Sequence, residues 1–101
     1  MSQQWQGFRS VAQEAVVSNK YNEALAKWPR LDEAWRGLEW LLARAAPESG
    51  RARQEAGEVF RVYKQEGDFL AKTPSILIVF TFDNACVTIH DVSFSEPPVP
   101  F

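Results

Sequence analysis

The sequence predicts an α+β fold with a short N-terminal strand, a helical hairpin and then a three-stranded antiparallel meander. Apolar residues recur at helical spacing between Tyr21 and Ala45, and they form runs and alternations typical of β-strands between Val59 and Phe94. The chain has 101 residues, of which 46% are hydrophobic and 24% charged, and its net charge is −2. A length and composition of this kind are typical of one soluble globular domain.

The first half of the chain is predicted to pass from a loose arm into helices. Residues 1–11 show no clear period, which predicts a loose N-terminal arm. Ala12 to Ser18 is ambiguous between strand and helix, although its Val-Val pair followed by Ser-Asn favours a strand that ends at a helix cap. Tyr21 to Trp28 has a helical period, and after a proline the residues Leu31 to Ala45 form a strongly amphipathic pattern. Together these two segments predict a helical hairpin.

The second half is predicted to be mainly β-structure. Arg51 to Gly57 is polar and is predicted to be a loop, and Val59 to Lys64 alternates as a strand does. Ile76 to Phe82 is apolar on both faces, which predicts a central strand buried on both sides. After a short turn, Cys86 to Phe94 is predicted to return as the last strand. The predicted boundaries are an arm at residues 1–11, one domain at residues 12–96 and a proline-rich tail at residues 97–101.

Two residue counts exclude whole classes of site. The single cysteine, Cys86, permits no intrachain disulfide and no CxxC motif, and a small buried thiol is its expected role. The single histidine, His90, excludes an HExxH arrangement and a His-rich metal site. The sequence therefore predicts no metal and no cofactor. The apolar run Ile76 to Phe80 is too short to cross a membrane, and the first ten residues lack the apolar core of a signal peptide, so a cytoplasmic location is predicted.

Charge is distributed unevenly along the chain. All eleven Lys and Arg residues lie at or before Lys72 together with ten acids, whereas three acids and no base follow, which leaves +1 in the first part and −3 in the second. We interpret the second part as a sheet segment buried on both faces. With a net charge of −2, the chain also lacks the broad basic surface that is typical of nucleic-acid-binding proteins.

The order of these segments resembles the RelE/ParE toxin superfamily of bacterial type II toxin–antitoxin systems. The residues that carry the likeness lie within 12–94 and read AVVSNKYNEALAKWPRLDEAWRGLEWLLARAAPESG, then VFRVYK, then TPSILIVFTFDNACVTIHDVSF. The resemblance implies a helical layer against a twisted antiparallel sheet, and an antitoxin partner with a flexible segment that wraps the toxin. RelE-like members cleave messenger RNA on the ribosome, whereas ParE-like members act on DNA gyrase.

A metal-independent ribonuclease of the RelE type needs cations on the sheet and a tyrosine or histidine. The candidates are Arg61, Tyr63 and Lys64 on one predicted strand and His90 on the last. Such members usually carry an arginine near the start of the strand that corresponds to Ile76 to Phe82, and this chain has none there. A solvated sheet edge for Arg61 and Tyr63, and a structural role for His90, remain as alternatives. The chain is therefore predicted to be a toxin that acts by binding a target such as DNA gyrase or the ribosome, with a ribonuclease or an inactive interaction module as alternatives.

Trp40 is the candidate anchor for a partner. It lies opposite the apolar stripe of the second predicted helix, between Arg36 and Arg44, each one turn away. Trp and Arg are enriched among the residues that dominate binding energy at interfaces. The alternative is that Trp40 packs under the N-terminal arm or another part of the same chain. The predicted binding residues for a cognate antitoxin are Trp40, Arg36, Arg44 and Phe101, and a homodimer is a further alternative.

Overall fold

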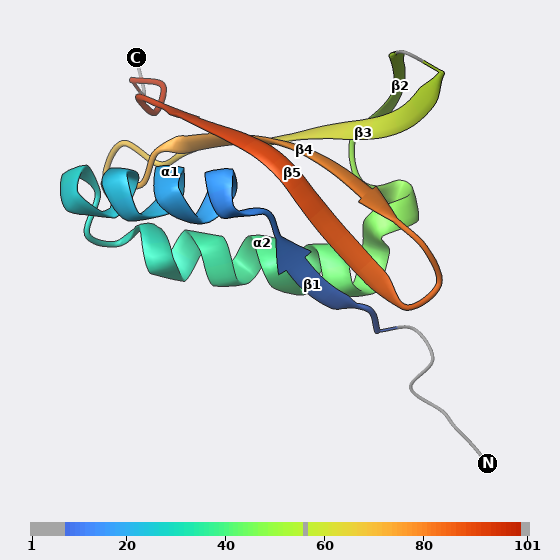
Figure 1. The fold of residues 1–101 in the computed structure, drawn as a ribbon. Coiled ribbons are helices and arrows are strands. Elements are labelled where there is room, and N and C mark those ends of the chain that lie inside the picture. The colour runs from blue at the N-terminus through green and yellow to red at the C-terminus, as the bar shows by residue number, and fades with distance from the viewer. Residues whose placement is uncertain (1–7, 56, 100–101) are drawn as a thin grey trace.

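The computed structural model describes residues 8–55 and 57–99, with the side chain of Glu55 left out. Within these residues, two helices lie on the same side of a five-stranded sheet, as Figure 1 shows. The α+β class predicted from the sequence is therefore confirmed. The elements in chain order are β1 (Ser10–Gln13), α1 (Ala15–Lys27), α2 (Leu31–Ala45), a 3-10 turn (Ala46–Glu48), β2 (Arg51–Glu55), β3 (Glu58–Gln65), β4 (Ser75–Phe82) and β5 (Cys86–Ser95).

The sheet has one strand more in its meander than the sequence predicts. Its order is β1-β5-β4-β3-β2, with antiparallel pairs from β2 to β5 and a parallel pair between β1 and β5. The prediction of a three-stranded meander was wrong because Arg51–Glu55, expected to be a loop, pairs with β3. An edge strand exposed to water needs backbone pairing but no apolar side chains, so its polar sequence carries no strand pattern. Gly57, at a φ of 80°, lies in the tight turn that joins β2 to β3.

The first strand and helix begin earlier than predicted. Ser10 and Val11, assigned from the sequence to the loose arm, belong to β1 and pair with Cys86 and Val87 of β5. The Val-Val pair favoured as a strand lies inside α1, where Val17 is fully buried in the core. This burial on a helix outweighs the β preference of valine. Residues 1–7 of the predicted arm lie outside the described residues.

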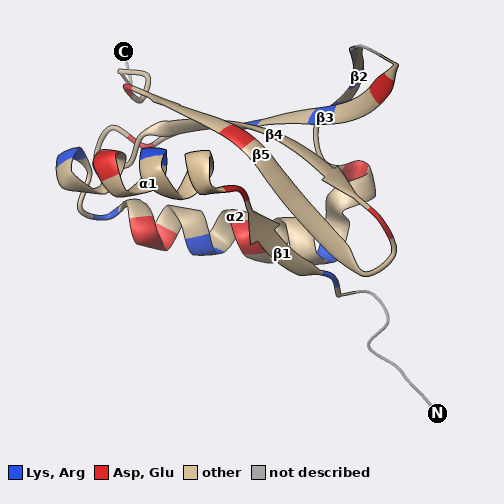
Figure 2. Ribbon diagram, in the orientation of Figure 1, with Lys and Arg blue, Asp and Glu red and all other residues tan. Residues whose placement is uncertain are grey.

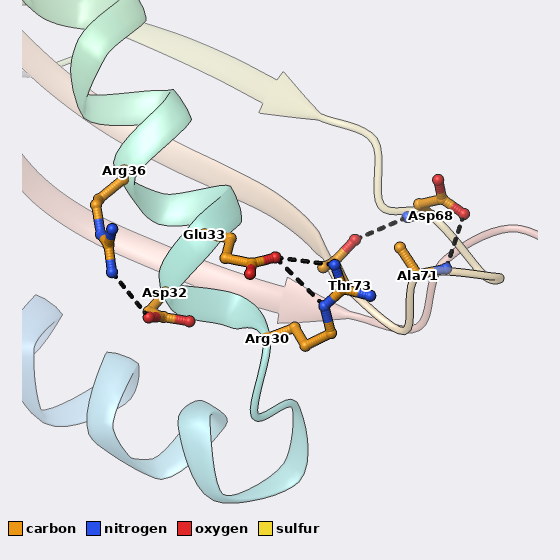
Figure 3. A network of polar contacts seen from close by, with 7 residues as sticks. All are labelled: Arg30, Asp32, Glu33, Arg36, Asp68, Ala71 and Thr73. Atoms are coloured by element: carbon orange, nitrogen blue, oxygen red, sulfur yellow. Dashed lines mark hydrogen bonds and ion pairs between the residues drawn. The ribbon is translucent and has the colours of Figure 1, made fainter.

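Helix α2 has the predicted bounds, Leu31–Ala45. Leu31, Leu38 and Leu42 are fully buried, and burial of each such side chain stabilises the fold by about 1.5–3 kcal/mol. On its outer side, Arg36 donates a hydrogen bond to Asp32 and Arg30 pairs with Glu33, as Figure 3 shows. All four of these charged side chains are more than a third exposed, so the pairs contribute little to stability. The helix is held by its apolar face.

The inner face of β4 forms the centre of the core. Ile76, Ile78 and Phe80 are buried against the helices and against inner residues of β5. The position of β4 in the middle of the sheet confirms the prediction of a central strand. The prediction that both faces of this strand are buried was wrong, because Leu77 on the other face is 39% exposed. Among the described elements, both helices lie on one side of the sheet (Figure 1).

The proline-rich tail leaves the sheet after β5. Pro97 is buried, and Pro98 and Val99 line a hollow together with residues 66–70 of the connection between β3 and β4. Pro100 and Phe101 lie outside the described residues. Among the helices of the described chain, none is long and apolar enough to cross a membrane.

Two glycines predict stability changes of opposite sign. Gly50 has a φ of 72°, and a Cβ there would lie 2.1 Å from the carbonyl oxygen of Val62, so Gly50→Ala should cost at least about 1–2 kcal/mol. Gly37 is exposed on α2 with no atom within 4 Å of such a Cβ, so Gly37→Ala should stabilise by about 1 kcal/mol. Urea unfolding of both variants measures the two free energies. Equal effects of the same sign would contradict this assignment.

Candidate functional site

The face of the sheet opposite the helices carries an apolar centre. We call this surface the open face and define its centre as Phe60 and Val62 of β3 with Leu77 and Val79 of β4. Val62 pairs with Val79 across the two strands. The four side chains line a cavity of about 330 Å³ together with Arg53 and Asp91. An antiparallel sheet with one solvated face usually places polar residues there, so these apolar residues are an exception to the pattern.

Three cations flank this centre. Arg51 is opposite Val62 and Arg53 is opposite Phe60 in the β2–β3 pairing, so both lie on the open face, as does Lys64 opposite Leu77. A second cavity of about 590 Å³ is lined in part by all three cations and adjoins the first through Val62 and Leu77. Neither Arg51 nor Lys64 forms an ion pair with any residue that the structure describes. In Figure 2, β4 is tan along its whole length because it contains no charged residue.

A chain of three polar side chains crosses the other end of the open face. A β-bulge pairs Val79 with Asp91 and Phe80 with Ile89, which leaves His90 as the extra residue of β5. The Nδ1 atom of His90 lies 2.5 Å from Oε2 of Glu14, and its Nε2 atom lies 2.7 Å from Oγ1 of Thr81.

The position of the imidazole follows from the turn between β1 and α1 and from its neighbour on β3. Glu14 directly precedes α1, and its backbone N–H donates to the carbonyl of Ile89 at 3.0 Å, which brings its carboxylate beside the bulge. The ring of Phe60 meets the His90 ring edge-on at a centroid distance of 5.7 Å. Both ring nitrogens of His90 and the ring itself therefore contact neighbours.

The three linked side chains of Glu14, His90 and Thr81 can orient a base or carry a proton. When Nδ1–H of His90 donates to Glu14, the free Nε2 can accept the hydroxyl proton of Thr81, and an imidazolium would donate at both positions. A carboxylate that fixes the tautomer of a histidine next to a hydroxyl is the arrangement from which general bases act. Among the described residues, no group of three or more His, Cys, Asp or Glu side chains is placed to hold a metal ion.

The structure divides the four candidate nuclease residues between the two faces of the sheet. Arg61 is opposite Phe80 and Tyr63 is opposite Ile78, so both lie on the helix-covered face. The guanidinium of Arg61 donates to the carbonyl oxygens of Ser49 and Gly50, each at 2.9 Å. Lys64 and His90 lie on the open face. The arginine and tyrosine are thus separated from the lysine and histidine by the sheet itself.

The predicted partner residues of α2 lie on a different surface. Trp40 is 57% exposed, its ring stacks on Phe8 with centroids 5.5 Å apart, and the guanidinium of Arg44 lies 5.5 Å from its ring centre. Arg36 pairs with Asp32 and also lines a groove of about 650 Å³ between β1 and α2. The contact with Phe8 is of the kind expected if Trp40 packs beside the N-terminal arm. Phe101, the fourth predicted residue, lies outside the described residues.

Burial also raises the pKa of one carboxyl group that lines this groove. Glu39 is half-buried on α2, and this loss of hydration raises its pKa above the ordinary value of 4.5, while the side chain of Trp35 and the charge of Arg36 act in the opposite direction.

Sequence reasoning missed four residues of the open face. Glu14 and Thr81 carry no local signal, because Glu14 meets His90 through the pairing of β1 with the distant β5 and Thr81 meets it through the bulge between β4 and β5. Arg51 and Arg53 were assigned to a loop, so their alternation on one side of a strand was not considered. The period-2 spacing of these two arginines is the one signal that the sequence offers.

The comparisons with known proteins identify no relative. No family model matches the sequence, and neither a curated protein nor a solved structure matches it.

Asp91 predicts how the stability of the protein depends on pH. Its pKa lies below the ordinary value of 3.8, mainly because Lys20 donates a hydrogen bond to the carboxylate at 2.8 Å and also because the Val92 N–H does so. The stabilisation is complete above the pKa of the unfolded chain and is lost as the pH falls through the lower folded value. Asp91→Asn should therefore be less stable than the native chain at neutral pH, and the two should converge in acid. Melting curves between about pH 6 and about pH 2 measure this. A gap that stays constant down to the acid end would contradict it.

Proposed function

We propose that the protein is the toxin of a type II toxin–antitoxin system, similar to RelE/ParE toxins, that binds a cellular target and is neutralised by a cognate antitoxin. The observation that carries this proposal is the order of the elements along residues 10–95. A short strand, two helices joined by three residues and an antiparallel meander follow each other, and this is the order that the RelE/ParE resemblance implies. The helical layer against one face of the sheet agrees with the same resemblance.

The positions of the candidate nuclease residues support binding over catalysis. Cleavage of RNA builds negative charge on a phosphate, which fixed cations must oppose. Arg61 is directed to the helix-covered face, where two carbonyl oxygens hold it. It is therefore not available beside Lys64 and His90 for one phosphate. This separation favours a target such as DNA gyrase or the ribosome that is inhibited by occupation.

The exposed Trp40 supports a protein partner. A large aromatic side chain gains by burial, yet the described chain leaves 57% of Trp40 in contact with water. Its ring is held by Phe8 and Arg44, so little further freedom would be lost when a partner covers it. We therefore propose Trp40, with Arg36 and Arg44, as the site that an antitoxin recognises.

Expression in a bacterial host tests this function. The chain alone should arrest growth, and co-expression of the small protein encoded next to it should restore growth. Trp40→Ala should still arrest growth but should escape neutralisation, because the change is proposed to affect the antitoxin site alone. The control is Val16→Ala, on the exposed side of α1, which should remain neutralised. If the folded protein does not arrest growth, the toxin assignment is contradicted. If it then still binds the small protein encoded next to it, an inactive interaction module is indicated instead.

Stability and binding should separate at two tryptophans of α2. Trp35 is 5% exposed, so Trp35→Ala should lower the free energy of unfolding by about 3–5 kcal/mol. Trp40→Ala should lower it by no more than about 1 kcal/mol but should weaken binding of the partner by about 2 kcal/mol or more. Urea unfolding and calorimetric titration with the partner measure the two quantities. Equal losses of stability would show that Trp40 is a core residue.

A ribosome-dependent messenger RNA endoribonuclease is the second candidate function. The specific observation in its favour is that Lys64 shares the open face with His90, which Glu14 and Thr81 hold in place. Primer extension on ribosome-bound messenger RNA separates the two functions. We expect no cuts from the purified chain. Cuts that disappear in both His90→Ala and Glu14→Gln would establish the nuclease, and cuts that survive both would indicate a contaminant.

A further inference from the structure

The apolar centre of the open face has the composition of a surface that is covered by another layer. β4 reads SILIVFTF, and strands with apolar residues on both sides are typical of sheets with a layer on each face. Helices α1 and α2 supply one layer, on the face of Ile76, Ile78 and Phe80. On the opposite face Leu77 is 39% exposed, and none of the described elements packs over it. The chain thus provides one of the two layers for which this strand is suited.

The charges around the centre restrict what can supply the second layer. Arg51, Arg53 and Lys64 flank one side of it, and all come from β2 and β3. Of the acids on this face, Asp91 at the other side of the centre is already paired with Lys20 of α1 at 2.8 Å, and Glu58 lies at the start of β3, beside the turn from β2. An occupant is therefore expected to be apolar where it meets Leu77 and acidic where it meets Arg51 and Lys64.

We propose that the open face binds an amphipathic, acidic α-helix of a partner protein. A helix is the element that packs on the face of a sheet, whereas an added strand would extend its edge. Its apolar stripe would cover Phe60, Val62, Leu77 and Val79, and its flanking Asp or Glu residues would pair with Arg51 and Lys64. This inference rests on the face itself and holds whether or not the protein is a toxin.

The same charges disfavour two other occupants. A symmetric pair of copies joined through this face would bring Arg51 and Lys64 of both copies into one interface and remove them from water, which opposes a dimer. Nucleic acid would require donors for phosphates across the face, but the centre of the face is apolar. The net charge of −2 also gives little gain from release of counterions.

Fluorescence anisotropy with designed probes tests the proposal on the full chain. The probe is a labelled helical peptide of about 20 residues with leucines along one stripe and glutamates elsewhere, and its twin carries lysines in place of the glutamates. The glutamate peptide should bind, more weakly as salt rises, and the lysine twin should bind at least about tenfold more weakly. Leu77→Glu and Lys64→Glu should each weaken binding by about tenfold or more.

The control is Val16→Glu, which adds the same charge at a valine that is 42% exposed on α1 and should leave binding unchanged. Melting curves establish that each variant is folded, and if Leu77→Glu is not, Lys64→Glu alone decides. No binding of the glutamate peptide at about 1 mM, or equal binding of its lysine twin, would overturn the proposal. A dimer dissociated by Leu77→Glu, or single-stranded RNA that binds more tightly than the peptide, would replace it with self-association or with a nucleic-acid surface.

Discussion

The parallel pairing of β1 with β5 places the first and last strands side by side, and the rest of the fold depends on this pairing. Because β1 occupies one edge of the sheet and β2 the other, the chain must cross the whole sheet between them. Helices α1 and α2 make this crossing, and both lie beneath the same face (Figure 1). The meander that follows then returns strand by strand to β1 without crossing the opposite face. One covered and one open face are thus a direct result of the topology.

The elements with strong local patterns were predictable from the sequence. The apolar stripe of Leu31–Ala45 gave the bounds of α2, and the composition of β4 located it in the middle of the sheet. Prediction failed for the segments whose secondary structure is decided by tertiary contacts. Arg51–Glu55 is a strand because β3 lies beside it, and the Val-Val pair of α1 is helical because Val17 is buried in the core. Local preference carries no information about such neighbours.

The candidate sites also differ in how far they could be predicted from local sequence patterns. The exposure of Trp40 followed from its angle on α2, which a helical period defines for every residue. The contact between Glu14 and His90 joins residues 76 positions apart, and it requires both the pairing of β1 with β5 and the bulge. The separation of Arg61 from Lys64 was implicit in the alternation of a strand, but which side the helices cover was not.

The distance along the chain between β1 and β5 also has a kinetic consequence. The contacts of β3, β4 and β5 are between neighbours in sequence and can form early, whereas β1 must wait for the last strand before it finds a partner. Closing so long a loop is slow, because its entropy is lost before the new contacts compensate. Until then the edge of β5 is open to pairing with another chain. During synthesis, the N-terminal strand therefore emerges first and is the last to be incorporated, and the newly made chain is exposed to aggregation in that interval.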